Sequence, residues 1–243
     1  MTLTRISKTF AGLLAAICVL SACGGGGSGG GSTAPDLADA QGRWRGSVVM
    51  TADTQNASAV VLPDGDVWMV YQTSSGDRRL VQGALSVNGQ QLSGSAKLFD
   101  LDIGSALGDL TLTAQARAGS SLSLNSSDAA RVGNFSGTSF EALSTPAISL
   151  AGVWSDDINT PTVQWTIAGN GNLTGSGTGC TVSGSVVARA DSARVADVQY
   201  VETCGGTVSN WSGVALNGDT ANSLRFTLVK SDRSQALIVA LIK

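Results

Sequence analysis

The feature that most constrains this chain is its succession of short apolar runs, each ended by residues that form tight turns. From Gln41 onward no long segment places apolar residues at helical spacing, whereas Leu110–Arg117 alternates apolar and polar side chains as a half-buried strand does. Turn signals recur at 63–66, 75–77, 88–89, 118–119, 169–172 and 217–219. Strands that begin about every ten residues and are joined by tight turns predict an all-β fold, an antiparallel barrel or sandwich.

Two of these runs carry more specific expectations. Val67–Tyr71 is apolar at every position, which predicts a strand that is covered on both faces. Ala236–Ile242 is also apolar throughout and predicts a buried closing strand. It is far shorter than the roughly 20 apolar residues that a helix needs to cross a bilayer.

A weak internal repeat divides the chain. Three segments of the first half resemble three segments of the second half, in the same order. The pairs are Gly42–Trp44 with Gly152–Trp154, Ala59–Tyr71 with Val163–Leu173, and Leu92–Ala96 with Val182–Val186. The matches predict two homologous modules of about one hundred residues each, the usual size of a small domain, at 37–145 and 146–243. Pro146 interrupts any strand at the predicted boundary. One continuous sandwich with chance matches is the alternative.

The N-terminal region has the pattern of a lipoprotein signal. Arg5 and Lys8 precede a short apolar run over 9–20, which predicts a signal peptide over 1–22. Leu20-Ser21-Ala22-Cys23 resembles the bacterial lipobox, which implies cleavage before Cys23 and attachment of diacylglyceryl and palmitoyl chains there. Segment 23–36 follows as a flexible Gly/Ser tether. An unlipidated signal peptide beside a chance cysteine is the alternative.

The remaining cysteines predict a disulfide. Cys18 falls in the predicted signal and Cys23 takes the lipid, so Cys180 and Cys204 are left in an oxidising compartment. If Val186 pairs with Val198 across an antiparallel hairpin, the same register places Cys180 directly opposite Cys204. Two buried free thiols are the alternative.

Charge and composition argue against several functions. The formal net charge of −3 argues against nucleic acid as a partner, because phosphate binding needs a basic surface. The sequence contains no histidine, which removes Ser-His-Asp and Cys-His nucleophile systems and imidazole metal sites. Asp100 with Asp102, and Asp156 with Asp157, are interpreted as turn formers or solvated charges rather than catalytic or calcium-binding carboxylates. We therefore expect no enzyme activity, no cofactor and no metal.

The five tryptophans are assigned mainly to the core. Trp44 and Trp154 occupy equivalent repeat positions, and Trp165 alternates in phase with Ile167, so these three are predicted to be buried. Trp68 and Trp211 are the candidate aromatics for a binding surface.

The poly-Gly tether, the Gly-x-Trp starts and the Gly-rich hairpins together resemble the glycine-tethered outer-membrane lipoproteins of Gram-negative bacteria. Transferrin-binding-protein-like and factor-H-binding-protein-like members of that group carry eight-stranded barrels on such tethers. Val61–Tyr71, followed by Val81–Gly83, is more similar to a group of uncharacterised proteobacterial lipoproteins. The resemblance implies two tandem small antiparallel β-barrels, lipocalin-like or transferrin-binding-protein-like. It also implies sorting to the outer membrane, because Gly rather than Asp follows the cysteine.

The functional hypothesis is a non-enzymatic binding or adhesion lipoprotein for a protein or glycan partner, held at the membrane by acyl chains on Cys23. One alternative is a lipocalin-like carrier of a small apolar ligand, because Gly-x-Trp at the start of a strand also resembles that superfamily. Another is a periplasm-facing accessory of envelope assembly. A filled barrel interior favours the binding module, whereas an apolar cavity of several hundred Å³ favours the carrier.

Overall fold

The computed structural model describes residues 35–50, 53–144, 147–156, 164–177, 179–218, 220 and 222–243. The predicted signal peptide, Cys23 and most of the tether lie outside these residues. The described part of the chain belongs to one compact unit and is almost wholly β-structure. Within it, no helix has both the length and the apolar character to cross a membrane.

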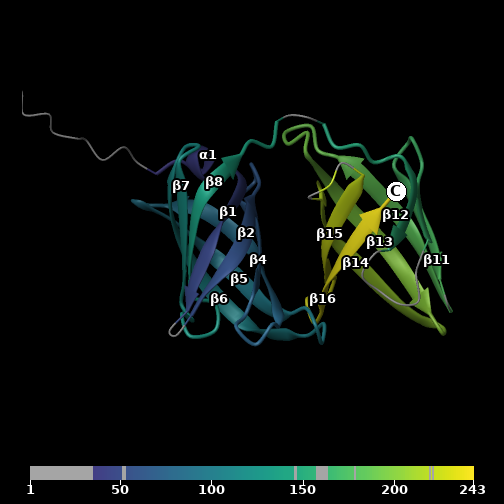
Figure 1. The fold of residues 1–243 in the computed structure, drawn as a ribbon, viewed down its shortest axis with the longest axis horizontal. Coiled ribbons are helices and arrows are strands. Elements are labelled where there is room, and N and C mark those ends of the chain that lie inside the picture. The colour runs from purple at the N-terminus through teal and green to yellow at the C-terminus, as the bar shows by residue number, and fades with distance from the viewer. Residues whose placement is uncertain are drawn as a thin grey trace, which may run out of the picture. The chain divides into compact units, whose positions relative to one another are not determined.

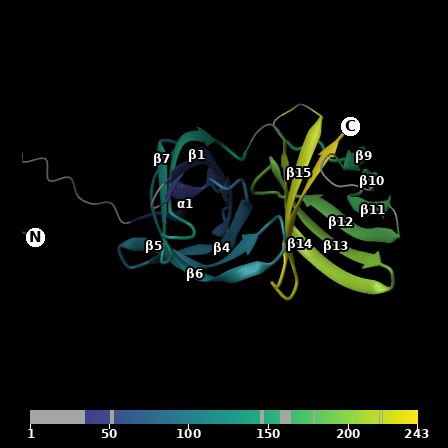
Figure 2. The same cartoon turned by 60° about the horizontal axis from the view of Figure 1, so that its bottom comes forward.

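The first barrel has eight antiparallel strands and closes when β8 pairs with β1 (Figure 1). The short helix α1 (Leu37–Ala40) precedes it, and Figure 2 shows this helix within the ring of strands. The strands are β1 (Gly42–Met50), β2 (Asp53–Val61), β3 (Asp66–Gln72), β4 (Arg78–Asn88), β5 (Gln91–Asp100), β6 (Ala106–Arg117), β7 (Ser121–Ser126) and β8 (Asn134–Glu141).

The second barrel repeats this arrangement and closes when β16 pairs with β9. Its strands are β9 (Gly152–Asp156), β10 (Gln164–Ile167), β11 (Asn172–Gly177), β12 (Cys180–Ala188), β13 (Val195–Cys204), β14 (Thr207–Asn217), β15 (Ser223–Lys230) and β16 (Ala236–Ile242). The predicted all-β class and the two tandem barrels are confirmed. The closing strand β16 coincides with the apolar run noted in the sequence, and Pro146 lies outside the described residues.

Alternation of side chains along the strands explains how each barrel encloses a core. In β6, Leu110, Leu112 and Ala114 are buried while the residues between them are exposed. Bulky side chains from all around each ring meet in its centre. Fully buried ones in the first barrel are Trp44, Met69, Leu92, Leu112, Leu122 and Phe135, and the second barrel buries Trp154, Trp165, Ile167, Tyr200, Phe226 and Leu228. Side chains therefore fill both interiors.

A third apolar cluster joins the outer walls of the two barrels. Val60, Trp68, Leu80 and Phe99 of the first barrel pack with residues of the second, which are Val195, Val214, Leu216, Val229 and Ala236. This cluster explains why the run over β3 is apolar at every position. Val67, Met69 and Tyr71 fill the barrel, while Trp68 on the opposite face is covered by the second barrel. The prediction of a strand covered on both faces is confirmed.

Polar contacts also join the barrels. Arg189 after β12 pairs with Asp64 in the turn before β3, with 2.6 Å between Nη2 and Oδ2. Arg233 donates to the side-chain oxygen of Gln82 at 2.7 Å. Ser105 and Gln235 form an isolated antiparallel bridge. These contacts add polar links between the two barrels beside the apolar cluster.

The internal repeat holds for two of its three segments. The Gly-x-Trp segments begin β1 and β9, and the second pair of segments forms the β2–β3 and β10–β11 hairpins. The third match is wrong, because Leu92–Ala96 lies in the fifth strand of its barrel and Val182–Val186 in the fourth. The strand equivalent to β12 is β4: Leu85 N donates to Gly65 O and Val186 N donates to Gly171 O, both at 2.8 Å.

Candidate functional site

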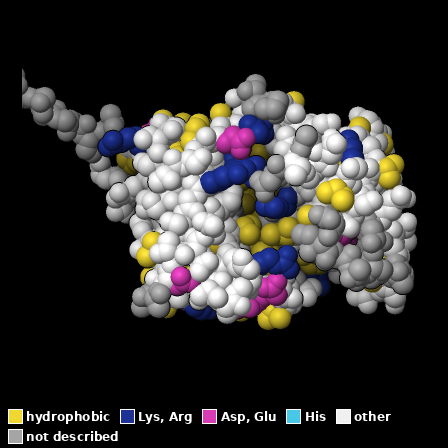
Figure 3. All heavy atoms as spheres, in the orientation of Figure 1, with side chains coloured by type: hydrophobic (Ala, Val, Ile, Leu, Met, Phe, Trp, Pro, Cys, Tyr) yellow, Lys and Arg dark blue, Asp and Glu magenta, His cyan; other side chains and the backbone are white. Residues whose placement is uncertain are grey.

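A groove of about 570 Å³ lies outside the barrels and is lined by four arginines. Arg43 and Arg45 come from β1, Arg78 begins β4, and Arg225 comes from β15 of the second barrel. The lining is completed by polar and small apolar residues of the first barrel, namely Gly46, Asn56, Ala57, Ser58, Val70, Tyr71, Gln72 and Ser139. In Figure 3, Lys and Arg side chains gather around hydrophobic side chains in a hollow near the middle of the visible face.

Strand alternation places these arginines on outer walls. Trp44 points into the first barrel, so its neighbours Arg43 and Arg45 point out of it, about 7 Å apart along the strand. Arg225 also points outward, because Leu224 and Phe226 on either side of it belong to the core of the second barrel. The groove forms where these outer walls face each other.

A smaller recess continues from the groove toward the apolar cluster. Arg43 and Arg225 line both hollows, and the recess is closed by Val60, Trp68, Leu216 and Thr227 among others. The indole N–H of Trp68 is buried and has no hydrogen-bond partner among the described residues. The arginines therefore stand at the mouth of an apolar recess.

Four arginines line the groove, in a chain with a net charge of −3. No acidic side chain is among the described residues that line it. Two carboxylates stand at its margin: Glu141 lies 3.6 Å from the guanidinium of Arg43, and Asp102 pairs with Arg78 Nε at 2.8 Å. These ion pairs orient two of the guanidinium groups. Arg43, Arg45 and Arg225 make further interactions as well, so each of the four guanidinium groups has a partner.

Arginine is a residue type that binds anions in proteins. The planar guanidinium group donates paired hydrogen bonds that match carboxylate, sulfate and phosphate oxygens. The volume also falls within the roughly 300–1,000 Å³ of ordinary ligand sites. The hydroxyl group of Tyr71, in the lining, donates to the carbonyl oxygen of Arg131 at 2.7 Å. Burial raises the pKa of this hydroxyl well above its usual value.

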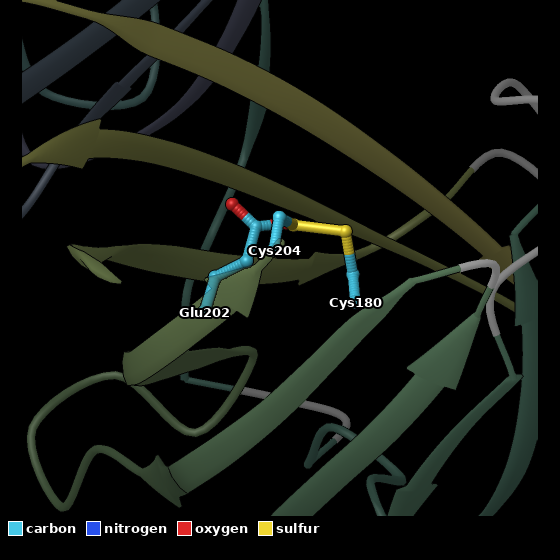
Figure 4. Close-up of side chains that lie close together, drawn as sticks. All are labelled: Cys180, Glu202 and Cys204. Atoms are coloured by element: carbon cyan, nitrogen blue, oxygen red, sulfur yellow. A yellow bond between two sulfur atoms is a disulfide. The ribbon is translucent and has the colours of Figure 1, made fainter. Parts of the chain in front are cut away.

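The predicted disulfide is present in the second barrel. Cys180 and Cys204 are directly paired in β12 and β13, with Cα atoms 4.2 Å apart, and Val186 pairs with Val198 as the register prediction required. Figure 4 shows Glu202 beside the bonded sulfur atoms. Its carboxylate accepts a hydrogen bond from Trp211 Nε1 at 3.2 Å. Because the disulfide takes up both sulfurs, this cluster offers no thiolate to a metal.

Trp68 and Trp211 require a correction, because neither forms an exposed aromatic surface. Their exposed fractions are 6% and 8%. The second barrel covers Trp68, and Trp211 points into the second barrel opposite Tyr200, with ring centroids 6.5 Å apart. The predictions for Trp44, Trp154 and Trp165 are confirmed, since all three are core residues.

Asp100 forms a turn, as the sequence predicts, whereas the prediction is wrong for Asp156, which is neither a turn former nor a solvated charge. Asp100 Oδ1 accepts hydrogen bonds from the backbone N–H groups of Asp102 and Ile103, at 2.9 and 3.2 Å, and so shapes the turn after β5. Its other oxygen pairs with Arg79 at 2.7 Å. Asp156 is buried in β9, and Asp157 lies outside the described residues.

The sequence predictions did not include the arginine groove. Its residues are spread from Arg43 to Arg225, and only the outward phase of Arg43 and Arg45 around Trp44 gave a signal. Comparisons of the chain with protein-family models, curated proteins and solved structures find no match. The function is therefore argued from the residues themselves.

Proposed function

We propose that this protein is a non-enzymatic binding lipoprotein, anchored in the outer membrane by acyl chains on Cys23. The observation that carries the proposal is the contrast between the barrels' interiors and their outer walls. Large buried side chains fill both interiors, while the basic groove lies outside, between the walls. A partner, protein or glycan, is thus bound on the outside, and the alternative of a carrier with an apolar ligand inside a barrel is disfavoured.

The composition supports a binding role over a catalytic one. The chain has no histidine, and Glu141 and Asp102, the acidic groups described at the margin of the groove, are engaged with Arg43 and Arg78. Guanidinium groups hold anions well but stay protonated at any physiological pH, so they make poor general bases. The groove therefore supplies recognition rather than proton transfer.

The sequence from Leu20 to Gly31 supports the anchor. The lipobox-like segment ends at Cys23, and Gly24–Gly31 is glycine throughout except for Ser28. A flexible Gly-rich chain lets a folded module reach partners near the bilayer. Two or three acyl chains bind a membrane stably, whereas one does so only marginally.

Mass spectrometry and cell fractionation test the proposal together. The mature N-terminus should be Cys23 carrying acyl chains, and Cys23→Ala should move the protein out of the membrane fraction. Protease added to intact cells should cleave the native protein. Recovery of an unmodified Cys23 would overturn the anchor, and resistance to protease until the outer membrane is opened would favour the periplasm-facing role instead.

A further inference from the structure

The geometry points to a binding site for a neutral oligosaccharide on the outer wall of the second barrel. A hollow of about 510 Å³ lies there over the middle of β12, β13 and β14, which run side by side (Figure 1). This volume falls within the range of ordinary ligand sites. The inference rests on the proposed function, because it names a glycan as the partner and states where on the protein the glycan binds.

The lining of this hollow is polar but uncharged. Its hydroxyl and amide side chains are those of Ser183, Ser185, Gln199, Asn210, Ser212 and Ser231. None of these six side chains makes a hydrogen bond to another described residue, so their donors and acceptors are open to a ligand. No charged side chain is among the described residues that line the hollow. Hydroxyl and amide groups both donate and accept hydrogen bonds, as the hydroxyl groups of a sugar do.

The first barrel carries charges at the corresponding place. Its strands β4, β5 and β6 correspond to β12, β13 and β14, and the register then matches the pair Lys97 and Asp109 with the pair Val201 and Asn210. Lys97 and Asp109 form an ion pair, with 3.4 Å between Nζ and Oδ1. Val201 is instead 38% exposed and offers an apolar contact to the C–H groups of a sugar ring. The wall of the second barrel thus differs from its counterpart in the way that a neutral ligand requires.

The floor of the hollow is fixed by packing and by a covalent bond. Tyr200 and Trp211 point into the barrel beneath it, with ring centroids 6.5 Å apart. The disulfide between Cys180 and Cys204 joins β12 and β13 three residues along each strand from the lining. A site that is held in place before its ligand arrives loses less conformational entropy on binding.

A neutral peptide is the weaker candidate. Peptides that bind β-proteins commonly do so by adding a strand to an unpaired edge. Along the lining, β12, β13 and β14 are each paired with a neighbouring strand on both sides, and Ser231 N donates to Asn210 O at 2.9 Å. A ligand in the hollow therefore meets side chains rather than free backbone groups, which favours a ligand recognised through its own hydroxyl groups.

Isothermal titration calorimetry with the purified full-length protein, in a detergent without a sugar headgroup, tests this inference. The probes are the neutral saccharides maltohexaose, mannohexaose and chitohexaose, a galacturonic acid hexamer, and a neutral hexapeptide of serine, glycine and asparagine. We expect at least one neutral saccharide to bind, and the acidic hexamer and the peptide each to bind at least about tenfold more weakly. High salt should leave the affinity unchanged, because the described lining holds no charge to be screened.

Exchanging the two charge patterns gives a matched pair of variants. Val201→Lys with Asn210→Asp places the ion pair of the first barrel in the hollow, and we expect it to weaken saccharide binding at least about tenfold. Lys97→Val with Asp109→Asn makes the reverse exchange on the first barrel, and its affinity should equal that of the native protein. Neither double variant changes the net charge. Circular dichroism checks that both are folded.

Gln199→Ala provides a second test that removes a single exposed side chain. It should weaken saccharide binding about three- to tenfold, the loss of one or two hydrogen bonds. Ser95→Ala is its control, because Ser95 occupies the corresponding position on β5 of the first barrel. This control should bind like the native protein.

Three outcomes would overturn the inference: no neutral saccharide binds, the acidic hexamer or the peptide binds equally well, or the variants of the second barrel bind like the native protein. None of these outcomes touches the anchor, which the acylation and protease experiments decide separately. If a neutral saccharide binds through Gln199 in a protein whose Cys23 is unmodified, the site stands and the proposed location fails.

Discussion

Trp44 and Trp154 occupy the same place in the two barrels and make the same hydrogen bond. Each indole Nε1 donates to the carbonyl oxygen four residues earlier, Ala40 at 2.8 Å and Leu150 at 2.9 Å. The indole rings are also covered by equivalent positions at the closing strand. Phe140 packs on Trp44 with ring centroids 4.8 Å apart, and Lys243 Nζ lies 4.2 Å from the ring centroid of Trp154. Each indole therefore connects the segment that precedes its barrel with the closing strand of that barrel.

Replacing Trp44 or Trp154 with phenylalanine should test this hydrogen bond. The ring stays aromatic, but a carbonyl oxygen loses its donor, which costs about 1–3 kcal/mol when the oxygen stays buried. Trp165→Phe is the matched control, because Trp165 Nε1 is buried without a partner among the described residues. Urea denaturation followed by circular dichroism should show larger losses for Trp44→Phe and Trp154→Phe. Equal losses in all three variants would contradict the assigned role.

Gly42 and Gly152 should tolerate alanine poorly and to different degrees. Their φ angles are 143° and 147°, in a region that side chains other than glycine rarely adopt. An added Cβ would lie 2.3 Å from Phe140 Cε2 in the first case and 2.6 Å from Lys243 Cε in the second. The lysine chain can move aside, whereas the Phe140 ring is packed on tryptophan.

We therefore expect Gly42→Ala to lower the thermal midpoint more than Gly152→Ala. Gly89→Ala is the control for backbone strain alone, because Gly89 has a φ of 61° and an added Cβ there meets nothing within 4 Å. That strain should cost about 1–3 kcal/mol. If Gly152→Ala proves the more harmful variant, the steric explanation fails.

The sequence predicted the strands well because alternation and turn chemistry act locally. It failed at the third repeat segment for a physical reason. Gly94 in β5 and Gly184 in β12 both let a neighbouring strand approach closely: an added Cβ would lie 1.7 Å from Ala84 O and 2.1 Å from Gln199 O. A glycine is needed for this close approach in two strands that are not equivalent. The Ser-Gly-Ser sequence therefore recurs in β5 and β12 without showing that the two strands correspond. The true counterpart of Gly184 is Gly83 in β4.

The groove and the burial of Trp68 could not be predicted by periodicity. Alternation showed that Arg43 and Arg45 share a face of a strand, but it could not predict that Arg225 lies beside them. Likewise, the phase of Trp68 places it on the outer wall, where a lone barrel would expose it. Only the packing of one barrel against the other decides both outcomes.

Removing the disulfide should destabilise the second barrel. Cys180 and Cys204 are separated by 24 positions, and closing a loop of this length contributes about 3–3.5 kcal/mol in the chain-entropy model. The double variant Cys180→Ser/Cys204→Ser should lower the urea midpoint, as should reduction of the native protein. The double variant itself should not respond to dithiothreitol. An unchanged midpoint after full reduction would show that the bond adds no stability.

Asp66 should make stability fall as pH rises. Burial raises its pKa above the ordinary value of 3.8, and the neighbouring Asp64 adds to the shift. A carboxyl whose pKa is higher in the folded state than in the unfolded state favours folding while protonated, and this benefit is lost as pH rises through the folded pKa. Asp66→Asn stays neutral, so it should exceed the native protein in stability at pH 7 but not at pH 3.

Thermal midpoints measured across that pH range check this expectation. The matched control is Asp109→Asn, which removes the same charge from a side chain that is 83% exposed on β6. Because Asp109 makes a surface ion pair with Lys97, its replacement should change stability by less than about 1 kcal/mol. A stability difference for Asp66→Asn that is the same at pH 3 and pH 7 would contradict the burial explanation.

Trp68→Ala should uncouple the two barrels, whereas Met69→Ala should not. These neighbours in β3 point to opposite faces: Trp68 into the cluster between the barrels and Met69 into the first barrel. Loss of either large buried side chain costs about 2–5 kcal/mol. The Trp68→Ala substitution weakens the contact between the two barrels rather than the core of either one. Calorimetry should therefore resolve two unfolding transitions. After Met69→Ala, the first barrel itself is weakened while its contact with the second persists. A single shared transition in Trp68→Ala would mean that Arg189–Asp64 and the other polar contacts suffice to couple the barrels.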